Sequence, residues 1–225
     1  MNIILIGPPG AGKGTQSKLL EENFDLKQLS TGDMLRAAKT SGSEMGKMVA
    51  QVMQRGDLVT DDIVIGLISE QIELETQVLG FIFDGFPRTL AQADALAELL
   101  KEKQKSDTIV IQMKVDDEVL VRRITGRFNC SECGEVYHKE SNLPKNDKIC
   151  NKCSAENCFI QRADDNESSF RTRLLAFYRD TAPLIGYYYA KGTLNSIDGL
   201  LDIRSTHEQI RLILDTETIL NLTSR

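Results

Sequence analysis

Short apolar runs alternate with amphipathic stretches along most of this chain. Residues 3–6, 81–83 and 109–111 are continuous apolar runs, as expected of strands buried on both faces of a parallel sheet. A further strand is expected over residues 193–197. Because strands and helices alternate, the sequence predicts an α/β fold in which helices cover both faces of a parallel sheet.

Between the expected strands, apolar residues recur every three to four positions, which is the spacing of a helix with one buried face. No apolar run is long enough to suggest a membrane span. The positions with helical spacing are Val64, Leu67, Ile68 and Ile72 in one segment, Leu90, Ala93, Ala97 and Leu100 in a second, Phe170, Leu174 and Phe177 in a third, and Ile210, Ile213 and Leu214 near the end.

Local signals indicate where several of these helices begin or end. Thr60 precedes two acidic residues and is suited to cap the helix that follows it. Pro183 is expected to break or kink the third helix near Ala182, because proline has no backbone N–H to donate. Ser205 and Glu208 have the spacing of a capping box, which predicts the start of the last helix.

The segment 7–15, Gly-Pro-Pro-Gly-Ala-Gly-Lys-Gly-Thr, directly follows the first strand and leads into a stretch that can start a helix. A glycine-rich turn lets the backbone approach a ligand, and the N–H groups at a helix start attract anions. Lys13 can reach the outer phosphates of a nucleotide, and Thr15 can ligate or orient Mg²⁺. Gly14 separates these two residues, so the general phosphate-loop pattern is not met strictly. The segment nevertheless predicts a phosphate-binding loop.

From about residue 128 to 161 the apolar periodicity disappears, and two C-x-x-C pairs stand 16 residues apart. The pairs are Cys130 with Cys133 and Cys150 with Cys153. This spacing is typical of a structural zinc site with four thiolate ligands. Because so small an element buries little apolar area, the metal is expected to hold it together, with no open position for chemistry. Cys158 is left over, either as a free thiol or as a spare ligand that competes with Cys153.

Composition limits the classes of protein to which the chain can belong. With 225 residues, 41% of them hydrophobic, it has the length for one core domain and a smaller insert. Its net charge of −6 argues against nucleic acid as the main partner. The apolar start leads straight into the glycine-rich loop and is interpreted as a core strand, not as a leader peptide. Five cysteines without an export signal favour metal or free thiols over disulfides, and a cytoplasmic location is expected.

Taken in order, the motifs of the chain resemble those of the adenylate kinase family in its bacterial long-lid, zinc-binding form. The resemblance covers essentially the whole chain. It implies a P-loop NTPase-like sheet with an inserted zinc lid and a small helical AMP-binding flap, and the reversible, Mg²⁺-dependent reaction ATP + AMP = 2 ADP. The matching segments are 7–15, Ser-Thr-Gly-Asp-Met-Leu-Arg at 30–36, Asp-Gly-Phe-Pro-Arg at 84–88, Gln92, Arg-Ile-Thr-Gly-Arg at 123–127, the paired cysteines, Arg-Ala-Asp-Asp at 162–165 and Arg-Thr-Arg at 171–173.

Transfer of a phosphoryl group between two nucleotides brings two polyanions together. Catalysis then depends on positioning and on fixed cations more than on a strong base. Arginine suits this task because its planar fork grips phosphate oxygens in pairs. The resemblance implies that the catalytic cations are Lys13, Arg88, Arg123, Arg127, Arg162 and Arg173.

The resemblance also implies which residues bind each nucleotide, with Gln92 reading the adenine of AMP. Asp84, helped by Asp33, resembles the carboxylate that holds Mg²⁺ through water. On the ATP side the residues are Gly10, Ala11, Gly12, Lys13, Gly14, Thr15, Arg123, Arg127, Val136, Tyr137 and Leu201, the last at a position that is often polar in relatives. On the AMP side they are Thr31, Arg36, Asp57, Leu58, Val59, Gly85, Phe86, Pro87, Arg88, Gln92, Arg162 and Arg173.

By the same resemblance the cysteine-bearing insert is a mobile lid that zinc keeps rigid, with hinge elements at Gly126 and at Asp164 and Asp165. The expected partners are ATP, AMP and ADP, without nucleic acid or membrane, and the family is usually monomeric. The expected divisions are a core domain of residues 1–29, 60–125 and 164–225, an AMP-binding domain of residues 30–59 and a lid of residues 126–163.

Two other functions fit parts of this pattern. A kinase for UMP or CMP shares the fold, but such kinases resemble Ser-Ala-Gly-Asp where this chain has Thr31, and their lids are short. A zinc-ribbon module on a degenerate nucleotide-binding scaffold would lack catalytic cations, and none of the matched positions is missing. His138 is interpreted as a packed or solvated side chain and His207 as a surface residue.

Overall fold

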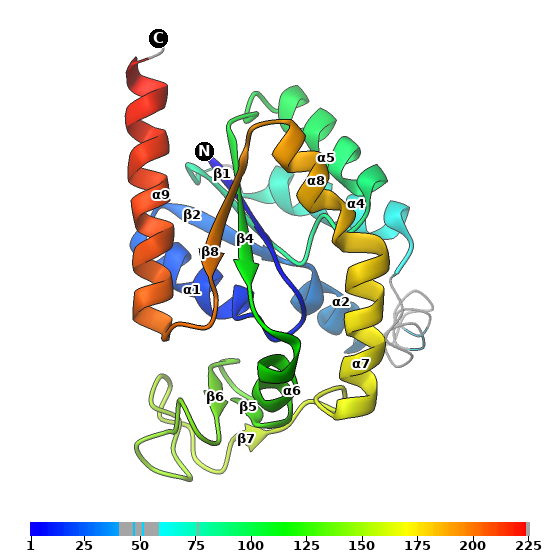
Figure 1. Ribbon diagram of the computed structural model, residues 1–225. Helices are drawn as coiled ribbons and strands as arrows, with labels where there is room; N and C mark the ends of the chain where they lie inside the picture. The colour runs from blue at the N-terminus through cyan, green and yellow to red at the C-terminus, as the bar shows by residue number, and fades with distance from the viewer. Residues whose placement is uncertain (41–46, 48–50, 52–58, 76, 224–225) are drawn as a thin grey trace.

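The computed structural model describes residues 1–40, 47, 51, 59–75 and 77–223 of the chain. Its centre is a sheet of five parallel strands in the order β2-β3-β1-β4-β8, with helices on both faces (Figure 1). The predicted α/β architecture is therefore confirmed. Within the described ranges, no helix has both the length and the apolar character needed to cross a membrane. The strands are β1 (Asn2–Ile6), β2 (Leu26–Ser30), β3 (Gly80–Asp84), β4 (Thr108–Lys114) and β8 (Leu194–Asp198).

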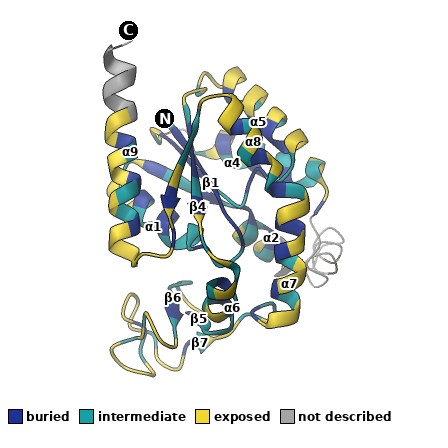
Figure 2. Cartoon of the chain, viewed as in Figure 1, coloured by how far each residue is buried: buried dark blue, intermediate teal, exposed yellow. Residues whose placement is uncertain are grey.

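Two hydrophobic cores, one on each face of the sheet, explain why the strands are continuous apolar runs. In β1, Ile4 and Ile6 face one core, whereas Ile3 and Leu5 face the other. These side chains are at most 2% exposed, and Figure 2 shows the buried residues along the strands and the inner sides of the helices. The first core is covered by α2 (Thr31–Thr40), α4 (Asp61–Leu74), α5 (Leu90–Glu102) and α8 (Pro183–Ala190), and the second by α1 (Lys13–Asn23), α6 (Asp117–Thr125), α7 (Glu167–Ala176) and α9 (Ile203–Thr223).

The predicted buried face is confirmed for α4 but is wrong for part of α5. Leu90 is 46% exposed and Ala97 faces solvent. The face that enters the core consists of Ala93, Leu96 and Leu100. Both sets of positions have helical spacing, and the structure selects the one that buries the larger Leu96 side chain.

The predicted interruption near Ala182 is confirmed. Helix α7 is followed by a π-helical segment, η1 (Phe177–Thr181), and the chain continues as α8 with Pro183 in its first turn. The Ala182 N–H donates to the Phe177 carbonyl over 2.8 Å, which is the wider spacing of a π-turn. Proline is tolerated at a helix start because an N–H there has no intrahelical acceptor.

The predicted capping box at the last helix is wrong. Helix α9 begins at Ile203, two residues before Ser205. Asp202 is the residue that caps it, since its Oδ1 accepts from the N–H groups of Arg204 and Ser205 over 2.9 and 3.1 Å. The Ser205 hydroxyl itself donates to Asp202 over 2.6 Å. The Asp202 carboxylate therefore takes the capping role that was predicted for Ser205, by accepting from the free N–H groups at the helix start.

Strand β2 and helix α6 are not evident from the apolar pattern. Strand β2 lies at an edge of the sheet and buries only Leu26 and Leu29, so it does not form a continuous apolar run. Helix α6 is short, with Asp116 as its cap: the carboxylate accepts from the Glu118 N–H over 2.9 Å. Both elements are held in place mainly by neighbours that lie far away in sequence.

Between α6 and α7 the chain forms a separate antiparallel sheet in the order β6-β5-β7, beyond the carboxyl ends of the main strands (Figure 1). Its strands are β5 (Arg127–Cys130), β6 (Val136–His138) and β7 (Phe159–Ile160). Its small core contains the rings of Phe128, Tyr137 and Phe159, whose centroids lie 5.1 to 5.7 Å apart. Few apolar side chains hold this element together, as predicted for the insert.

Candidate active site

The carboxyl ends of β1, β2 and β3 meet at one edge of the sheet. The strand register places Asp84 beside both Leu5 and Ser30. The glycine-rich loop that follows β1 therefore lies next to the segments that follow β2 and β3, where ligands bind in open parallel sheets. A cleft of about 1120 Å³ occupies this edge and extends to the antiparallel sheet.

The glycine-rich loop is shaped for close contact with an anion. Gly12 has φ of 98° and caps α1, a conformation that other residues rarely adopt. The Gln16 N–H closes the first helical bond, on the Gly12 carbonyl at 3.1 Å. Earlier N–H groups at a helix start have no intrahelical acceptor, and the helix dipole makes this end positive. The part of the loop that lines the cleft includes every residue expected there, namely Gly10, Ala11, Gly12, Lys13, Gly14 and Thr15.

Lys13 lies deep in this cleft. Its Nζ donates to the carbonyls of Gly7 and Pro8 over 2.7 and 2.9 Å. Desolvation lowers the pKa of the Lys13 ammonium to about 8; Asp84 opposes this shift, whereas nearby arginines including Arg88 add to it. Burial and the neighbouring arginines thus disfavour the charged ammonium in the free protein, and an anion bound here would offset that cost.

Arginines surround the same space. Desolvation, reinforced by Arg173, lowers the pKa of Arg88 to about 10. Desolvation also lowers the pKa of Arg162 to about 10, with repulsion from Arg127 and Arg36 as further causes. No carboxylate in the described part of the chain forms an ion pair with Arg88 or Arg162. This arrangement favours a polyanion between the side chains.

Other arginines of the cleft have acidic partners that the sequence analysis did not assign. Arg127 donates through Nε to Oδ2 of the buried Asp165 over 2.8 Å, and a second bond joins Nη2 to Oδ1. Arg173 donates to Oδ2 of Asp164 over 2.7 Å. The sequence analysis assigns the acidic pair next to Arg162 only to a hinge, although adjacent carboxylates among arginines are a signal for such pairing. These bonds orient the guanidinium groups in the cleft.

The expected AMP side is brought together in part. Thr31 is buried and donates to the Gly85 carbonyl over 2.9 Å. Arg88 donates through Nε to the same carbonyl over 2.8 Å. Gln92, which is 2% exposed, accepts from the Arg88 N–H over 2.7 Å. Thr31, Arg36, Val59, Gly85, Arg88, Gln92, Arg162 and Arg173 line the cleft.

Two expected AMP residues, Phe86 and Pro87, do not line the cleft, and two others lie outside the described residues. Phe86 is 1% exposed and packs in the first core near Phe83, with ring centroids 6.4 Å apart. Its side chain therefore serves the core and does not face the cleft. Pro87 lines a smaller cavity behind the glycine-rich loop. Asp57 and Leu58 lie outside the described residues.

The expected ATP-base side is a loop between β8 and α9. Arg123 donates through Nη1 to the Gly199 carbonyl over 2.8 Å, and Leu201 lines the cleft. Gln16, which the sequence analysis missed, donates through Nε2 to the Ile203 carbonyl over 2.9 Å. Its Oε1 lies 3.3 Å from Nδ1 of His207, so His207 is half-buried and paired, not a free surface residue as predicted.

On the lid sheet, Val136 and Tyr137 also line the cleft. The Tyr137 ring is 2% exposed and packs inside the lid. Its hydroxyl accepts from the Asn151 N–H over 2.8 Å and lies 3.4 Å from Cys150 Sγ. The side chain thus supports the cysteine cluster.

Asp84 lies directly against the glycine-rich loop. A Cβ atom at Gly14 would stand 3.2 Å from its Oδ2, and Gln28 donates to that same oxygen over 3.2 Å. Desolvation raises the pKa of Asp84, opposed by Lys13. Asp33, the other expected Mg²⁺ residue, lines the cleft and pairs with Arg36. A carboxylate beside the loop fits the hard oxygen ligands that Mg²⁺ prefers.

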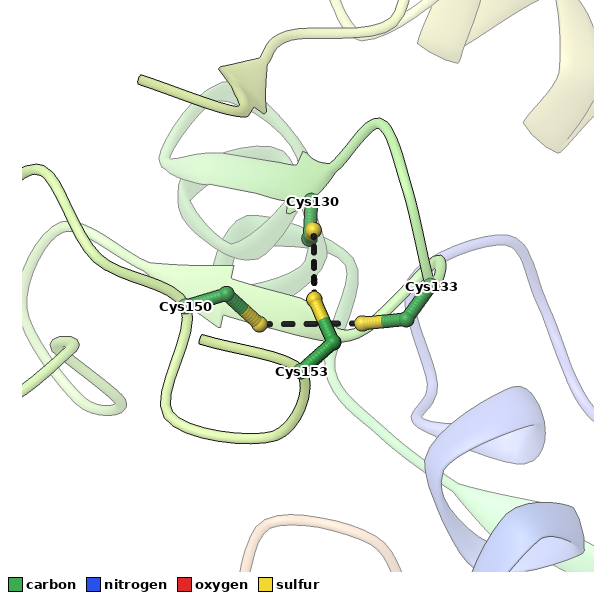
Figure 3. A group of neighbouring side chains, drawn as sticks. All are labelled: Cys130, Cys133, Cys150 and Cys153. Atoms are coloured by element: carbon green, nitrogen blue, oxygen red, sulfur yellow. Dashed lines mark hydrogen bonds between the residues drawn. The ribbon is translucent and has the colours of Figure 1, made fainter. Parts of the chain in front are cut away.

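The paired cysteines converge on one point (Figure 3). The Sγ atoms of Cys130 and Cys153, and those of Cys133 and Cys150, lie 3.6 Å apart, and all four are within 4.8 Å of one another. Tetrahedral zinc with Zn–S distances near 2.3 Å requires sulfur atoms about 3.8 Å apart. The donor set therefore fits zinc. Cys158 stands outside this group and its Sγ donates to the Ala155 carbonyl over 3.2 Å.

Comparisons with known proteins agree with this geometry. A family model described as adenylate kinase matches residues 5–193. The adenylate kinase of Paracoccus denitrificans is 56% identical, covering 96% of this chain and 97% of that protein. The adenylate kinases of Rhizobium rhizogenes and Archaeoglobus fulgidus are 51% and 47% identical, covering 95% and 96% of this chain and 99% and 98% of theirs. From its loop, its cations and these similarities over nearly its whole length, the chain belongs to the adenylate kinase family.

Proposed function

We propose that this enzyme transfers the γ-phosphoryl group of ATP to AMP, ATP + AMP = 2 ADP, between Lys13 and the surrounding arginines of the cleft. One observation carries the assignment of these residues. Lys13, Arg88 and Arg162 line one cleft at the carboxyl edge of the sheet without an ion pair to any described carboxylate, and desolvation lowers the pKa of each. Positive charge that the protein itself does not neutralise stabilises the charge that spreads over a phosphoryl group in transfer.

On the donor side, the loop N–H groups and Lys13 bind the ATP phosphates, with Thr15 at the helix start. Arg123 holds the loop that receives the base, through its bond to the Gly199 carbonyl. Arg127 approaches from the lid strand β5, oriented by Asp165. On the acceptor side the AMP phosphate lies between the guanidinium groups of Arg36 and Arg88, and Gln92 meets the adenine base.

Asp84 is the residue that we assign to Mg²⁺, through water, with Asp33 as a second carboxylate. Mg²⁺ bound with ATP neutralises phosphate charge and orients the transferred group. Asp84 itself faces the loop and Lys13, and Gln28 fixes one of its oxygens. The carboxylate is thereby held in one orientation beside the phosphates.

We infer that residues 126–163 act as a lid and residues 30–59 as an AMP-binding domain on a core of residues 1–29, 60–125 and 164–225. Arg127 lies at one end of the lid and Arg162 at the other, and Arg123 lies just before its first residue, so lid closure brings these arginines together on the phosphates and excludes water. Four thiolates leave zinc no open position. Zinc would therefore hold the lid rigid without joining the chemistry. We further propose that the enzyme is a cytoplasmic monomer whose partners are ATP, AMP and ADP.

A coupled assay of ADP formation tests this proposal. With ATP as donor, AMP is expected to exceed UMP and CMP in kcat/KM by about 10²-fold or more. A preference for UMP or CMP would contradict the assignment of the acceptor site. Absence of transfer with every monophosphate would support the non-catalytic zinc-ribbon alternative.

The lowered pKa of Lys13 predicts a specific pH dependence. Below about pH 8 the ammonium is charged and attracts phosphate; above that value the free enzyme carries a neutral amine. Because kcat/KM reports the free enzyme, its value for ATP should fall about tenfold per pH unit above pH 8. The kcat at saturating ATP should fall only at higher pH, since bound phosphates favour the charged form. A flat kcat/KM profile up to pH 10 would contradict the lowered pKa of Lys13.

The lid contacts α1 through charged side chains, and this contact predicts a further effect. Lys18 donates to the Gly134 carbonyl over 2.8 Å, and Lys152 pairs with Glu22 over 2.8 Å. Exposed pairs contribute about 0.2–1 kcal/mol, so Glu22→Lys should raise KM for ATP by at most about fivefold, with KM for AMP unchanged. The double variant Glu22→Lys/Lys152→Glu should restore KM, and 0.5 M salt should remove the difference. An equal effect on both substrates would exclude a lid-specific contact.

A further inference from the structure

The side-chain amide of Gln92 is fixed in a single orientation. Its Oε1 accepts from the Arg88 N–H over 2.7 Å, and its Nε2 donates to Oδ1 of Asp61 over 2.6 Å. A backbone N–H can only donate and an ionised carboxylate can only accept. The Arg88 N–H requires the amide oxygen on its side, and the Asp61 carboxylate requires the NH₂ group on the other. Exchanging O and N would therefore break both bonds.

Asp61 is itself held at both oxygens. Its Oδ2 accepts from the Thr89 hydroxyl over 3.0 Å, and Thr89 in turn caps α5 by accepting from the Gln92 N–H over 3.1 Å. Asp61 is the first residue of α4, where the helix dipole favours a carboxylate. One hydrogen-bond network thus joins the starts of α4 and α5. Within this network, Gln92 lines the cleft.

The fixed amide still has one acceptor position and one donor position that a ligand can use. Oε1 retains one lone pair and Nε2 retains one N–H. This order matches the Watson–Crick edge of adenine, where the 6-amino group donates and N1 accepts. Hypoxanthine has the same shape but the opposite order, because its O6 accepts and its N1–H donates. Guanine and uracil share the opposite order.

We propose that Asp61 is a specificity-determining positioning residue: by holding the Gln92 amide it selects an acceptor base with an amino group beside a ring acceptor. The inference rests on the proposed contact of Gln92 with the AMP base. To accept hypoxanthine, the amide would have to turn. Its oxygen would then face the Asp61 carboxylate and its NH₂ the Arg88 N–H. Both contacts are unfavourable, and the amide is too deeply buried for water to relieve them.

The test compares AMP with IMP, which differ only at this edge. In Asp61→Asn the new side chain can accept or donate, so it offers a partner to either orientation of the Gln92 amide. We expect the ratio of kcat/KM for AMP to that for IMP to fall about tenfold, with KM for ATP unchanged. The control is Asp62→Asn, which removes an exposed carboxylate from the same helical turn and should leave the ratio unchanged.

A second variant and a reference variant keep the outcomes distinct. Thr89→Val frees Oδ2 of Asp61 and should lower the same ratio by a smaller factor, which covers the case that Asp61→Asn does not fold. Gln92→Leu tests the underlying contact and should lower the ratio most. If Gln92→Leu lowers it but Asp61→Asn and Thr89→Val reduce turnover of AMP and IMP equally, Asp61 is only structural and the inference is overturned. An unchanged ratio in Gln92→Leu would instead overturn the proposed base contact together with this inference.

Discussion

Replacing Lys13 with methionine is expected to lower kcat/KM for ATP by about 10²-fold or more. Methionine keeps most of the length of the side chain but removes the charge that follows the transferred group. The ammonium is desolvated in the free enzyme, as its pKa of about 8 indicates. Removing a charge held at such a site costs the fold little, so the melting temperature should be unchanged or slightly higher.

The measurement is steady-state ADP formation with thermal unfolding of the same sample. Lys101→Met is a suitable control, because that lysine lies on the exposed surface of α5 and should retain normal turnover. Near-normal activity in Lys13→Met would remove this residue from the site. A large drop in melting temperature would show that the loss of activity reflects unfolding and not chemistry.

Breaking the cysteine cluster is expected to have the largest effect on stability. Cys130→Ser removes one of the four converging sulfur atoms, and the lid has only a small aromatic core to compensate. A structural metal contributes several kcal/mol, and each kcal/mol shifts the melting temperature of a domain of this size by roughly 2–4 °C. We therefore expect a decrease of about 10 °C, with substantial activity retained at low temperature.

Cys158→Ala provides the matched control for this experiment. Cys158 is buried in the same small hydrophobic core of the lid but is not among the four converging thiols. The control should keep one metal ion per chain, measured by elemental analysis, whereas Cys130→Ser should lose it. Complete loss of activity in a still-folded Cys130→Ser protein would mean that the metal does more than hold the lid. Loss of metal from Cys158→Ala would make that cysteine a ligand.

Features that depend on neighbouring residues were predictable from the sequence. The strands had to be continuous apolar runs because both faces of β1 and β3 are buried. The glycine-rich loop and the C-x-x-C pairs require fixed spacing, since backbone geometry brings their groups together within a few residues. The expected positions of Lys13 and of the four clustered cysteines follow from such local constraints.

Features that depend on partners distant in sequence were not predictable from the sequence. Asp61 meets Gln92 across 31 positions, and Asp165 meets Arg127 across 38. The sequence does not show which residue pairs with which, because the pairing is decided by how helices and strands pack. For the same reason Phe86, which stands in a nucleotide-binding motif, is taken into the core by its neighbour Phe83.

The amino-acid sequence by itself determined the class of fold, the phosphate-binding loop, the cysteine cluster and the identity of the candidate cations. The first three rest on short-range rules of burial, backbone conformation and ligand spacing, whereas the candidate arginines were identified by the resemblance of their motifs to the family. Only the tertiary structure decided which carboxylates orient those cations, which face of α5 is buried, where α9 begins and how the Gln92 amide is held. In each case the local sequence favours several partners or boundaries about equally. The one that forms is decided by which groups lie close together in three dimensions and by which of them are desolvated.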